Sequence, residues 1–263
     1  MATAACGEPP AGWPGRREYL APERRGELVV DGRLDDAAWA AAPWSDRFVD
    51  IEGDVRPAPP LATRVRMLWD SGYWYIGAEL QEPDLWATIT VRDSVIYFDD
   101  DFEVFVDPDG DGLRYFELEI NALGTVWDLY LPKPYRDGGK ARNDWDIAGL
   151  QAAVAVAGTL NDPSDRDRGW TVELAIPWAA LAYGDYAAPP PRPGDRWRVN
   201  FSRVDWTLDT VAGGYRKRSG PDGRPLAEAN WVWSPQGAIN MHLPERWGTV
   251  RFGGDAPGNG EPQ

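Results

Sequence analysis

The chain has 263 residues and a formal net charge of −15 at pH 7, which argues against nucleic acids and anionic membrane surfaces as partners because both attract Lys and Arg. Neutral or cationic partners remain compatible with this charge. No apolar run approaches the roughly 18 residues that a membrane-spanning helix needs. Cys6 and His242 are the only residues of their types, which excludes an internal disulfide and argues against a catalytic triad or a histidine-rich metal site. The chain also has 15 Trp and 10 Tyr, so we expect some aromatic rings to be exposed for ligand binding besides those that fill a core.

Residues 1–25 are rich in Pro, Gly and Arg without periodicity, and we predict an N-terminal arm or tail there. The first ten residues lack the charged and apolar regions of a complete signal peptide. The tetrapeptide around Cys6 resembles the junction at which bacterial lipoproteins are cleaved, but chance agreement is the simpler interpretation.

From Leu28 onward, short alternating segments separated by Gly- and Pro-containing turns predict β-strands. The predicted strands are 63–69, 73–80, 101–107, 114–121, 124–131, 151–158, 170–176, 195–201, 230–233 and 247–252. Helical signals are short, at 35–42 and 177–181, and 132–148 is a long polar loop of the kind that often carries function. This pattern predicts an all-β fold, an antiparallel β-sandwich of the jelly-roll or immunoglobulin-like type, with one domain over 26–252 and a C-terminal tail over 253–263.

The strands around residue 103 are unusually acidic. Because side chains alternate along a strand, Phe102 and Val104 are expected in the core and Glu103 on the opposite face. The same alternation in the next strand places Glu117, Glu119 and Asn121 on one face. Carboxylates beside aromatic rings suit a ligand rich in hydroxyl groups, whereas the alternative is a solvated outer face of the sheet.

The turn DPDGDG places Asp107, Asp109 and Asp111 at alternating positions next to two glycines. This spacing resembles the start of a calcium loop with oxygen ligands, although it lacks the distal Glu of an EF-hand. An ordinary Asp/Gly hairpin turn is the alternative.

Seven segments, in this order, resemble family 9 carbohydrate-binding modules over roughly residues 28–252. They are VDGRLDDAAW (30–39), RMLWDSGYWYIGAEL (66–80), DDFEVFVDPDGD (100–111), YFELEINALGTVWD (115–128), GWTVELAIPW (169–178), VNFSRVDW (199–206) and WGTVRF (247–252). The resemblance implies a calcium-binding β-sandwich, typically appended to secreted hydrolases of plant cell walls, that holds a sugar between two aromatic rings. It therefore implies a secreted or periplasmic origin, and we expect a monomer with a carbohydrate ligand.

The resemblance also implies which residues contact the ligand. The ligand-binding glutamate of the family falls on Glu103, and the first stacking ring falls on Tyr97 rather than on a Trp. The second stacking ring falls on Trp233.

Polar contacts of the family fall on Asn230 and Ser202, with Arg203 beside the latter. Where members that bind sugar carry an Arg, this chain has Glu119, so that a hydrogen-bond donor is replaced by an acceptor. The ligand or its orientation is therefore expected to differ.

Two other functions are compatible with the residues. Glu103, Glu117, Glu119 and Asp128 supply enough carboxylates for a glycoside-acting enzyme, which needs two at a defined separation. A haem protein is a weaker alternative, because the neighbouring Met241 and His242 are expected to point to opposite sides of a strand.

Overall fold

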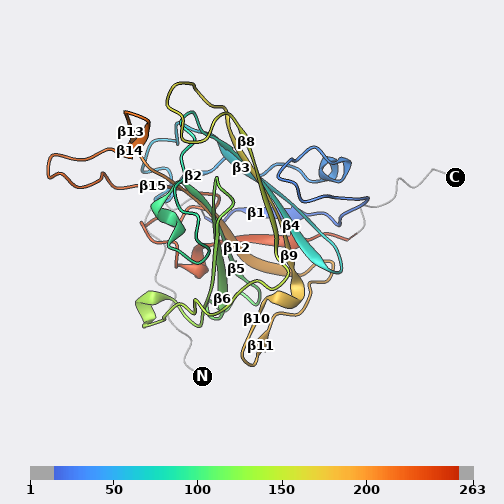
Figure 1. Cartoon of the computed structure of the whole chain (residues 1–263). Helices are drawn as coiled ribbons and strands as arrows, with labels where there is room; N and C mark the ends of the chain where they lie inside the picture. The colour runs from blue at the N-terminus through green and yellow to red at the C-terminus, as the bar shows by residue number, and fades with distance from the viewer. Residues whose placement is uncertain (1–14, 255–263) are drawn as a thin grey trace.

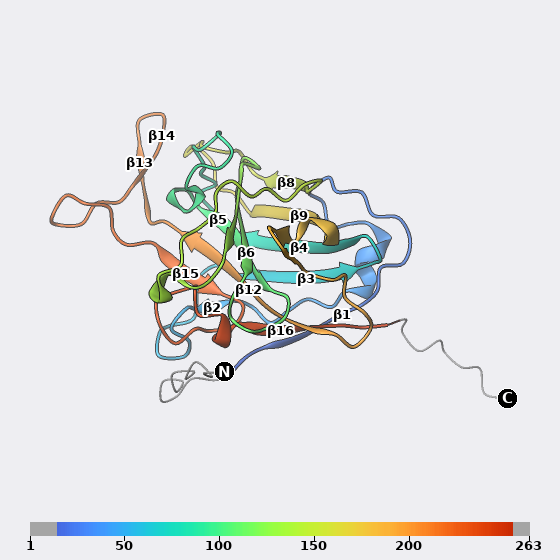
Figure 2. The same cartoon turned by 90° about the horizontal axis from the view of Figure 1, so that it is seen from below.

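The computed structural model describes residues 15–254, and the predicted tails over 1–14 and 255–263, with Cys6, lie outside the described residues. Two β-sheets pack face to face, as Figures 1 and 2 show. The predicted antiparallel β-sandwich is therefore confirmed. Among residues 15–254, no helix is long and apolar enough to cross a membrane.

The larger sheet has eight strands, and every pairing in it is antiparallel except that of β1 with β16. Its main order is β1-β16-β12-β5-β6-β7, while β15 pairs with the second half of β12 and β2 pairs with β15. The strands are β1 (Glu18–Ala21), β2 (Val49–Asp50), β5 (Asp101–Asp107), β6 (Tyr115–Asn121), β7 (Val126–Leu131), β12 (Arg196–Asp205), β15 (Ala229–Val232) and β16 (Gly248–Phe252).

The smaller sheet has the antiparallel order β3-β4-β9-β8. Its strands are β3 (Thr63–Trp69), β4 (Tyr73–Gln81), β8 (Gln151–Ala157) and β9 (Gly169–Pro177). Two short hairpins complete the strands: β10 (Ala182–Tyr183) with β11 (Tyr186–Ala187), and β13 (Leu208–Val211) with β14 (Gly214–Lys217). The β13–β14 hairpin projects from the body of the sandwich in both views (Figures 1 and 2).

The helices of the described chain are short 3₁₀ turns. They are η1 (Ala37–Ala41), η2 (Ile96–Phe98), η3 (Tyr135–Asp137), η4 (Trp178–Ala180) and η5 (Pro244–Arg246). The predicted helical segment 35–42 is too short to be stable as an isolated α-helix. Packing fixes it instead, because Trp39 is buried and its Nε1 donates a hydrogen bond to Glu173 at 2.8 Å.

The main core lies between the sheets and follows the predicted alternation. Phe102 and Val104 of β5 are buried in it together with Phe201 of β12, whereas Glu103 lies on the outer face of the larger sheet. The outer face of this sheet carries a second apolar cluster that includes Phe105 and Trp247. The larger sheet is thus covered on both faces, which explains why even its outward side chains are buried.

The described part of the predicted N-terminal tail belongs to the sandwich. Residues 18–21 form β1, which pairs in parallel with β16, and Tyr19 and Ala21 are buried in the main core. The predicted domain boundary at residue 26 is therefore wrong. The short β1 segment gains its stability from a partner near the other end of the chain, which local periodicity does not reveal.

Candidate functional site

A pocket of about 510 Å³ opens on the outer face of the larger sheet. Its lining combines carboxylates, amides and aromatic rings from β5, β6, β7, β12 and β15, from η2 and η3, and from the loops around Ile51, Glu228 and Met241. The lining residues are Ile51, Tyr97, Glu103, Phe105, Glu117, Glu119, Trp127, Leu129, Tyr135, Val204, Glu228, Asn230, Ile239, Asn240, Met241 and His242. The structure thus brings together Tyr97, Glu103, Glu119 and Asn230, four of the predicted ligand residues.

The floor of the pocket is set by strand register. Glu103 lies directly opposite Glu119 on β6, and Ser202 of β12 lies opposite Glu103 on its other side. All three face outward because their neighbours Phe102, Leu118 and Phe201 fill the core. Ser202 is fully buried beside Glu103 and does not itself line the pocket.

The floor carboxylates are buried without a compensating cation. Glu103 and Glu117 are 5% and 6% exposed, and Oε2 of each lacks a hydrogen-bond partner. Burial raises the pKa of Glu103 to about 7, an effect that Ser202 opposes and the charge of Glu228 reinforces. Burial also raises the pKa of Glu117, with a further contribution from the charge of Glu103.

A deeper carboxylate extends this group. Carboxylate oxygens of Asp101, Glu103 and Glu119 lie within 4.8 Å of one another. Burial and then the charges of Asp101 and Glu103 raise the pKa of Glu119, whose Oε2 accepts a hydrogen bond from the backbone N–H of Tyr97 at 3.0 Å. The pocket floor is therefore a concentrated set of hydrogen-bond acceptors with a strong affinity for protons.

Aromatic rings surround these carboxylates. Tyr97 and Tyr135 are 37% and 45% exposed, and Trp127 lies opposite Glu119 in the strand register. Burial and the charges of Glu117 and Glu119 raise the pKa of Tyr135 to about 12, so its hydroxyl interacts electrostatically with the carboxylates of the pocket floor.

Trp127 and Tyr135 are pocket residues that the sequence prediction missed. Side-chain alternation in 124–131 puts Trp127 on one face with Leu129, and this signal could have identified both as pocket residues. Tyr135 belongs to the polar loop 132–148 that was expected to carry function, but only the folded chain shows where that loop lies.

Met241 and His242 are placed differently from the prediction. They lie in a loop rather than on a strand, and both line the pocket. His242 Nδ1 makes a 2.9 Å hydrogen bond with the Tyr115 hydroxyl, and burial lowers the pKa of His242 to about 4. The ring is therefore neutral at pH 7 and adds no positive charge to the pocket.

The assignment of Trp233 as a stacking ring is wrong. Trp233 is 1% exposed and packs against Phe201 in the main core, with ring centroids 5.8 Å apart. A Cβ atom added to Gly248 would lie 2.4 Å from this ring, which shows how tightly it is enclosed. Trp231, on the same face of its strand, is also in the core. The outward side chains of this segment are Val232, in the outer apolar cluster, and Asn230, which lines the pocket.

Arg203 is likewise remote from the pocket. It shares the inward face of β12 with Phe201, is 1% exposed and forms an ion pair with Glu82. Its Nη1 donates to the backbone oxygen of Gln81 at 2.7 Å, and its Nη2 contacts Asp205 at 2.6 Å. The charge of Arg203 is therefore committed to joining the two sheets.

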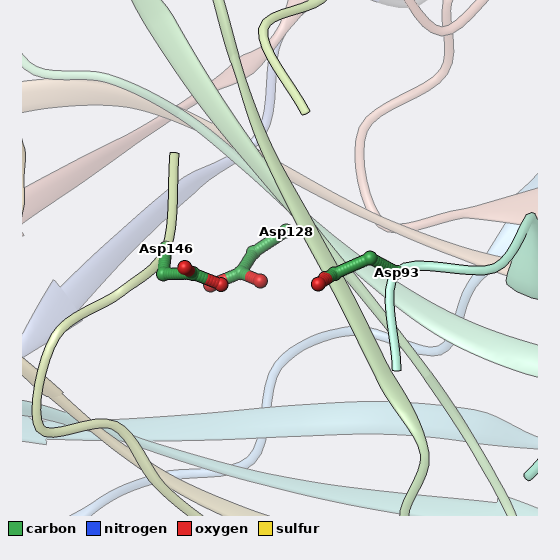
Figure 3. A group of neighbouring side chains, drawn as sticks. All are labelled: Asp93, Asp128 and Asp146. Carbon is green, nitrogen blue, oxygen red and sulfur yellow. The ribbon is translucent and has the colours of Figure 1, made fainter. Parts of the chain in front are cut away.

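Asp128 lies on the opposite face from the glutamates with which it was grouped. It pairs with Leu118 in the register, and its carboxylate joins those of Asp93 and Asp146, which point toward one another in Figure 3. Arg92 contacts both Asp128 and Asp146, the latter at 2.9 Å, and supplies positive charge to this cluster. Asp128 therefore cannot act together with Glu103 on one substrate.

The turn between β5 and β6 brings Asp107, Asp109 and Asp111 within 4.8 Å of one another. Asp107 accepts hydrogen bonds from the backbone N–H groups of Gly110 and Gly112, both at 2.9 Å. Arg114 contacts Asp109 and Asp111 at 3.0 and 2.7 Å. Three carboxylates fit the oxygen chemistry of calcium, but Arg114 already balances part of their charge.

Fold and pocket together define the class: a β-sandwich binding domain with an acidic, aromatic-lined pocket on one sheet. A family model described as "Carbohydrate family 9 binding domain-like" matches residues 30–190, and the chain belongs to this family. A search of curated proteins gave no match.

Solved structures with this fold share little sequence with the chain. A family 9 carbohydrate-binding module from Caldicellulosiruptor kristjanssonii, solved with cellotriose, is 15% identical with a TM-score of 0.56, over 94% of this chain and 99% of that one. A second structure of a family 9 carbohydrate-binding module from Caldicellulosiruptor kristjanssonii, solved with glucose, is 15% identical with a TM-score of 0.53, over 92% of this chain and 100% of that one. A protein from Bacteroides uniformis gives 16% identity and a TM-score of 0.64, over 90% and 100%.

Proposed function

We propose that the protein binds a carbohydrate, without catalysis, in the pocket on the outer face of the larger sheet. The observation that carries this proposal is the combination of buried acceptor oxygens with partly exposed rings in one pocket, in a chain of the family 9 type. The structural relatives solved with cellotriose and glucose support the same class of ligand.

The pocket chemistry suits a sugar. Carboxylate oxygens of Glu103 and Glu117 accept hydroxyl protons, and the amide of Asn230 can donate or accept. Tyr97, Trp127 and Tyr135 offer apolar ring faces for the C–H groups of a pyranose. Three rings at the pocket replace the pair of Tyr97 and Trp233 that the sequence predicted.

We further propose that calcium binds the β5–β6 turn through Asp107, Asp109 and Asp111. These carboxylates would hold the ion, which would supply a structural cross-link and no chemistry. The support is the close approach of three hard oxygen donors on a glycine-containing turn. Calcium has to compete with Arg114 for Asp109 and Asp111.

The carbohydrate proposal is tested by calorimetric titration of the purified chain with glucose, cellotriose and a panel of other oligosaccharides. We expect binding of at least one sugar, weakened at least about tenfold by Tyr97→Ala or Tyr135→Ala through loss of a stacking ring. Tyr73→Ala, on the smaller sheet, is the matched control and should keep the wild-type affinity.

Two results would contradict the proposal. Failure of every sugar in the panel to bind the folded protein would remove carbohydrate binding altogether. Accumulation of shorter products from an incubated oligosaccharide, measured by chromatography, would show a glycoside-acting enzyme instead.

A further inference from the structure

The pocket holds carboxyl groups that no cation in its lining balances. Glu103, Glu117, Glu119 and Glu228 line it, and no Lys or Arg is among the lining residues. The electrostatic effect reaches Tyr97, whose pKa is raised first by burial and then by the charges of these four glutamates. With a neutral sugar these groups retain protons, as their raised pKa values indicate, whereas a cationic ligand allows them to ionise and pair with it.

Two other buried carboxylates of the described chain have hydrogen-bond or ion-pair partners. Glu82 is paired with Arg203, and Glu173 accepts hydrogen bonds from Trp39 and from two backbone N–H groups. In the pocket, by contrast, Glu103 Oε2 and Glu117 Oε2 are buried and without a partner. A buried carboxylate without a partner is costly, so these two oxygens favour a ligand that donates hydrogen bonds and carries positive charge.

The rings favour an organic cation over a bare ion. Tyr97, Trp127 and Tyr135 line the same pocket, and ring faces attract ammonium groups. The protein already displays this interaction elsewhere, since Lys217 Nζ lies 3.3 Å from the ring centroid of Trp206, outside the pocket lining. Glu119, where the resemblance led us to expect an Arg, removes a group that would repel such a ligand.

We propose that the ligand of this pocket is a cationic sugar, an amino sugar with a free, protonated amine, which places its ammonium group against Glu103, Glu117 and Glu119. An ammonium group has three N–H donors, which match the carboxylates of the floor, while the sugar hydroxyls use the remaining acceptors. The pocket volume of about 510 Å³ is adequate for one or two sugar rings. This inference rests on the proposed carbohydrate function and narrows it to one chemical class.

The test compares three disaccharides that share a β-1,4 linkage: the glucosamine disaccharide with free amines, its N-acetylated form and cellobiose. Calorimetry is done near pH 6.5 on EDTA-treated protein. We expect the free-amine disaccharide to bind at least about tenfold more tightly than either neutral sugar, which is the ratio that one charge-assisted hydrogen bond supplies.

Two variants locate the preference. Glu103→Gln and Glu119→Gln each keep the shape of the side chain and should lower the affinity for the free-amine disaccharide much more than the affinity for the neutral sugars, so that most of the preference for the free amine is lost. Glu27→Gln is the control, because it removes the same charge far from the pocket. Glu27 is exposed, and its neighbour Leu28 packs on the outer face of the smaller sheet. Melting curves confirm that each variant is folded, and the two pocket variants provide independent tests.

The outcomes separate this inference from the function on which it rests. Cellobiose binding as tightly as the free-amine sugar would overturn the inference and leave carbohydrate binding intact. Binding of no sugar would overturn both. Calcium binding to the EDTA-treated protein that disappears in Glu119→Gln would show that the floor holds a metal ion, and would also overturn the inference.

Discussion

At the scale of single residues, the direction of a side chain decides its role more than its chemical type does. On the adjacent strands β5 and β12, Glu103 pairs with Ser202, and Arg203 is the next residue of β12. Glu103 nevertheless faces the pocket, whereas Arg203 faces the core. A shift of one residue reverses the face of a strand side chain. Glu119 matters for the same reason, since its outward position adds a carboxylate to the pocket where the resemblance implied an Arg.

The position of Trp233 leads to a prediction about stability. Trp233→Ala should lower the free energy of unfolding by about 3–5 kcal/mol, because removing a buried Trp leaves a cavity between the sheets. Chemical denaturation followed by circular dichroism measures this loss. Tyr97→Ala is the comparison, and its partly exposed ring should cost much less. A Trp233→Ala protein as stable as wild type that fails to bind sugar would return Trp233 to the ligand site.

At the scale of elements, β5 and β6 carry both candidate sites. Their outward side chains form the pocket floor, and the turn that joins them holds the three aspartates. A cation at the turn would therefore stabilise the same hairpin that positions Glu103 and Glu119. The two sites are linked through one rigid element rather than through direct contact.

Calcium should raise the melting temperature of the protein through this turn. A ligand that binds only the folded state stabilises it in proportion to the logarithm of its concentration, by about 2.7 kcal/mol at 100 times the dissociation constant. The measurement compares melting curves in EDTA and in millimolar calcium, with Asp109→Asn as the variant that should lose the response. Identical curves for the wild-type protein in the two conditions would refute the calcium proposal.

At the scale of the whole molecule, the net charge of −15 and the buried carboxylates make stability depend on pH. Glu103 has a pKa of about 7 in the folded protein and an ordinary value of 4.5, so the folded state retains a proton that the unfolded state releases. Its stabilising contribution is complete below about pH 4.5 and is lost as the pH rises through 7. Glu117 and Glu119 shift in the same direction, whereas His242 acts oppositely, but only between about pH 4 and 6.5.

The melting temperature in EDTA should therefore fall between pH 6.5 and 8. Glu103 alone accounts for about 0.8 kcal/mol over this interval, because a full difference of one proton changes the free energy of unfolding by about 1.4 kcal/mol per pH unit and the folded state releases its proton within this range. Glu103→Gln should show a smaller fall. A melting temperature that rises over this interval, or an equal fall in the variant, would contradict the raised pKa of Glu103.

Much of the fold was predictable because it depends on local alternation. The segments around Phe102 and Val104 repeat every two residues, and that period alone separates the core face from the outer face. The same rule placed Glu103, Glu117 and Glu119 together on one face. The segment around Trp39 was predicted as a helix and forms a short 3₁₀ turn, because five residues are too few for helix propensity to outweigh packing.

What the sequence determined by itself was the β-sandwich, the acidic face of one strand pair and the absence of chemistry that needs several Cys or His residues. Only the tertiary structure shows which aromatic rings lie beside the acidic face of β5 and β6. Trp231 and Trp233 share a strand face, but only packing against the second sheet shows that this face is the core. Tyr135 reaches the pocket through a loop, and β1 joins a strand from the other end of the chain. Contacts between residues distant in sequence depend on how the two sheets and the loops pack together, and local alternation of side chains does not reveal them.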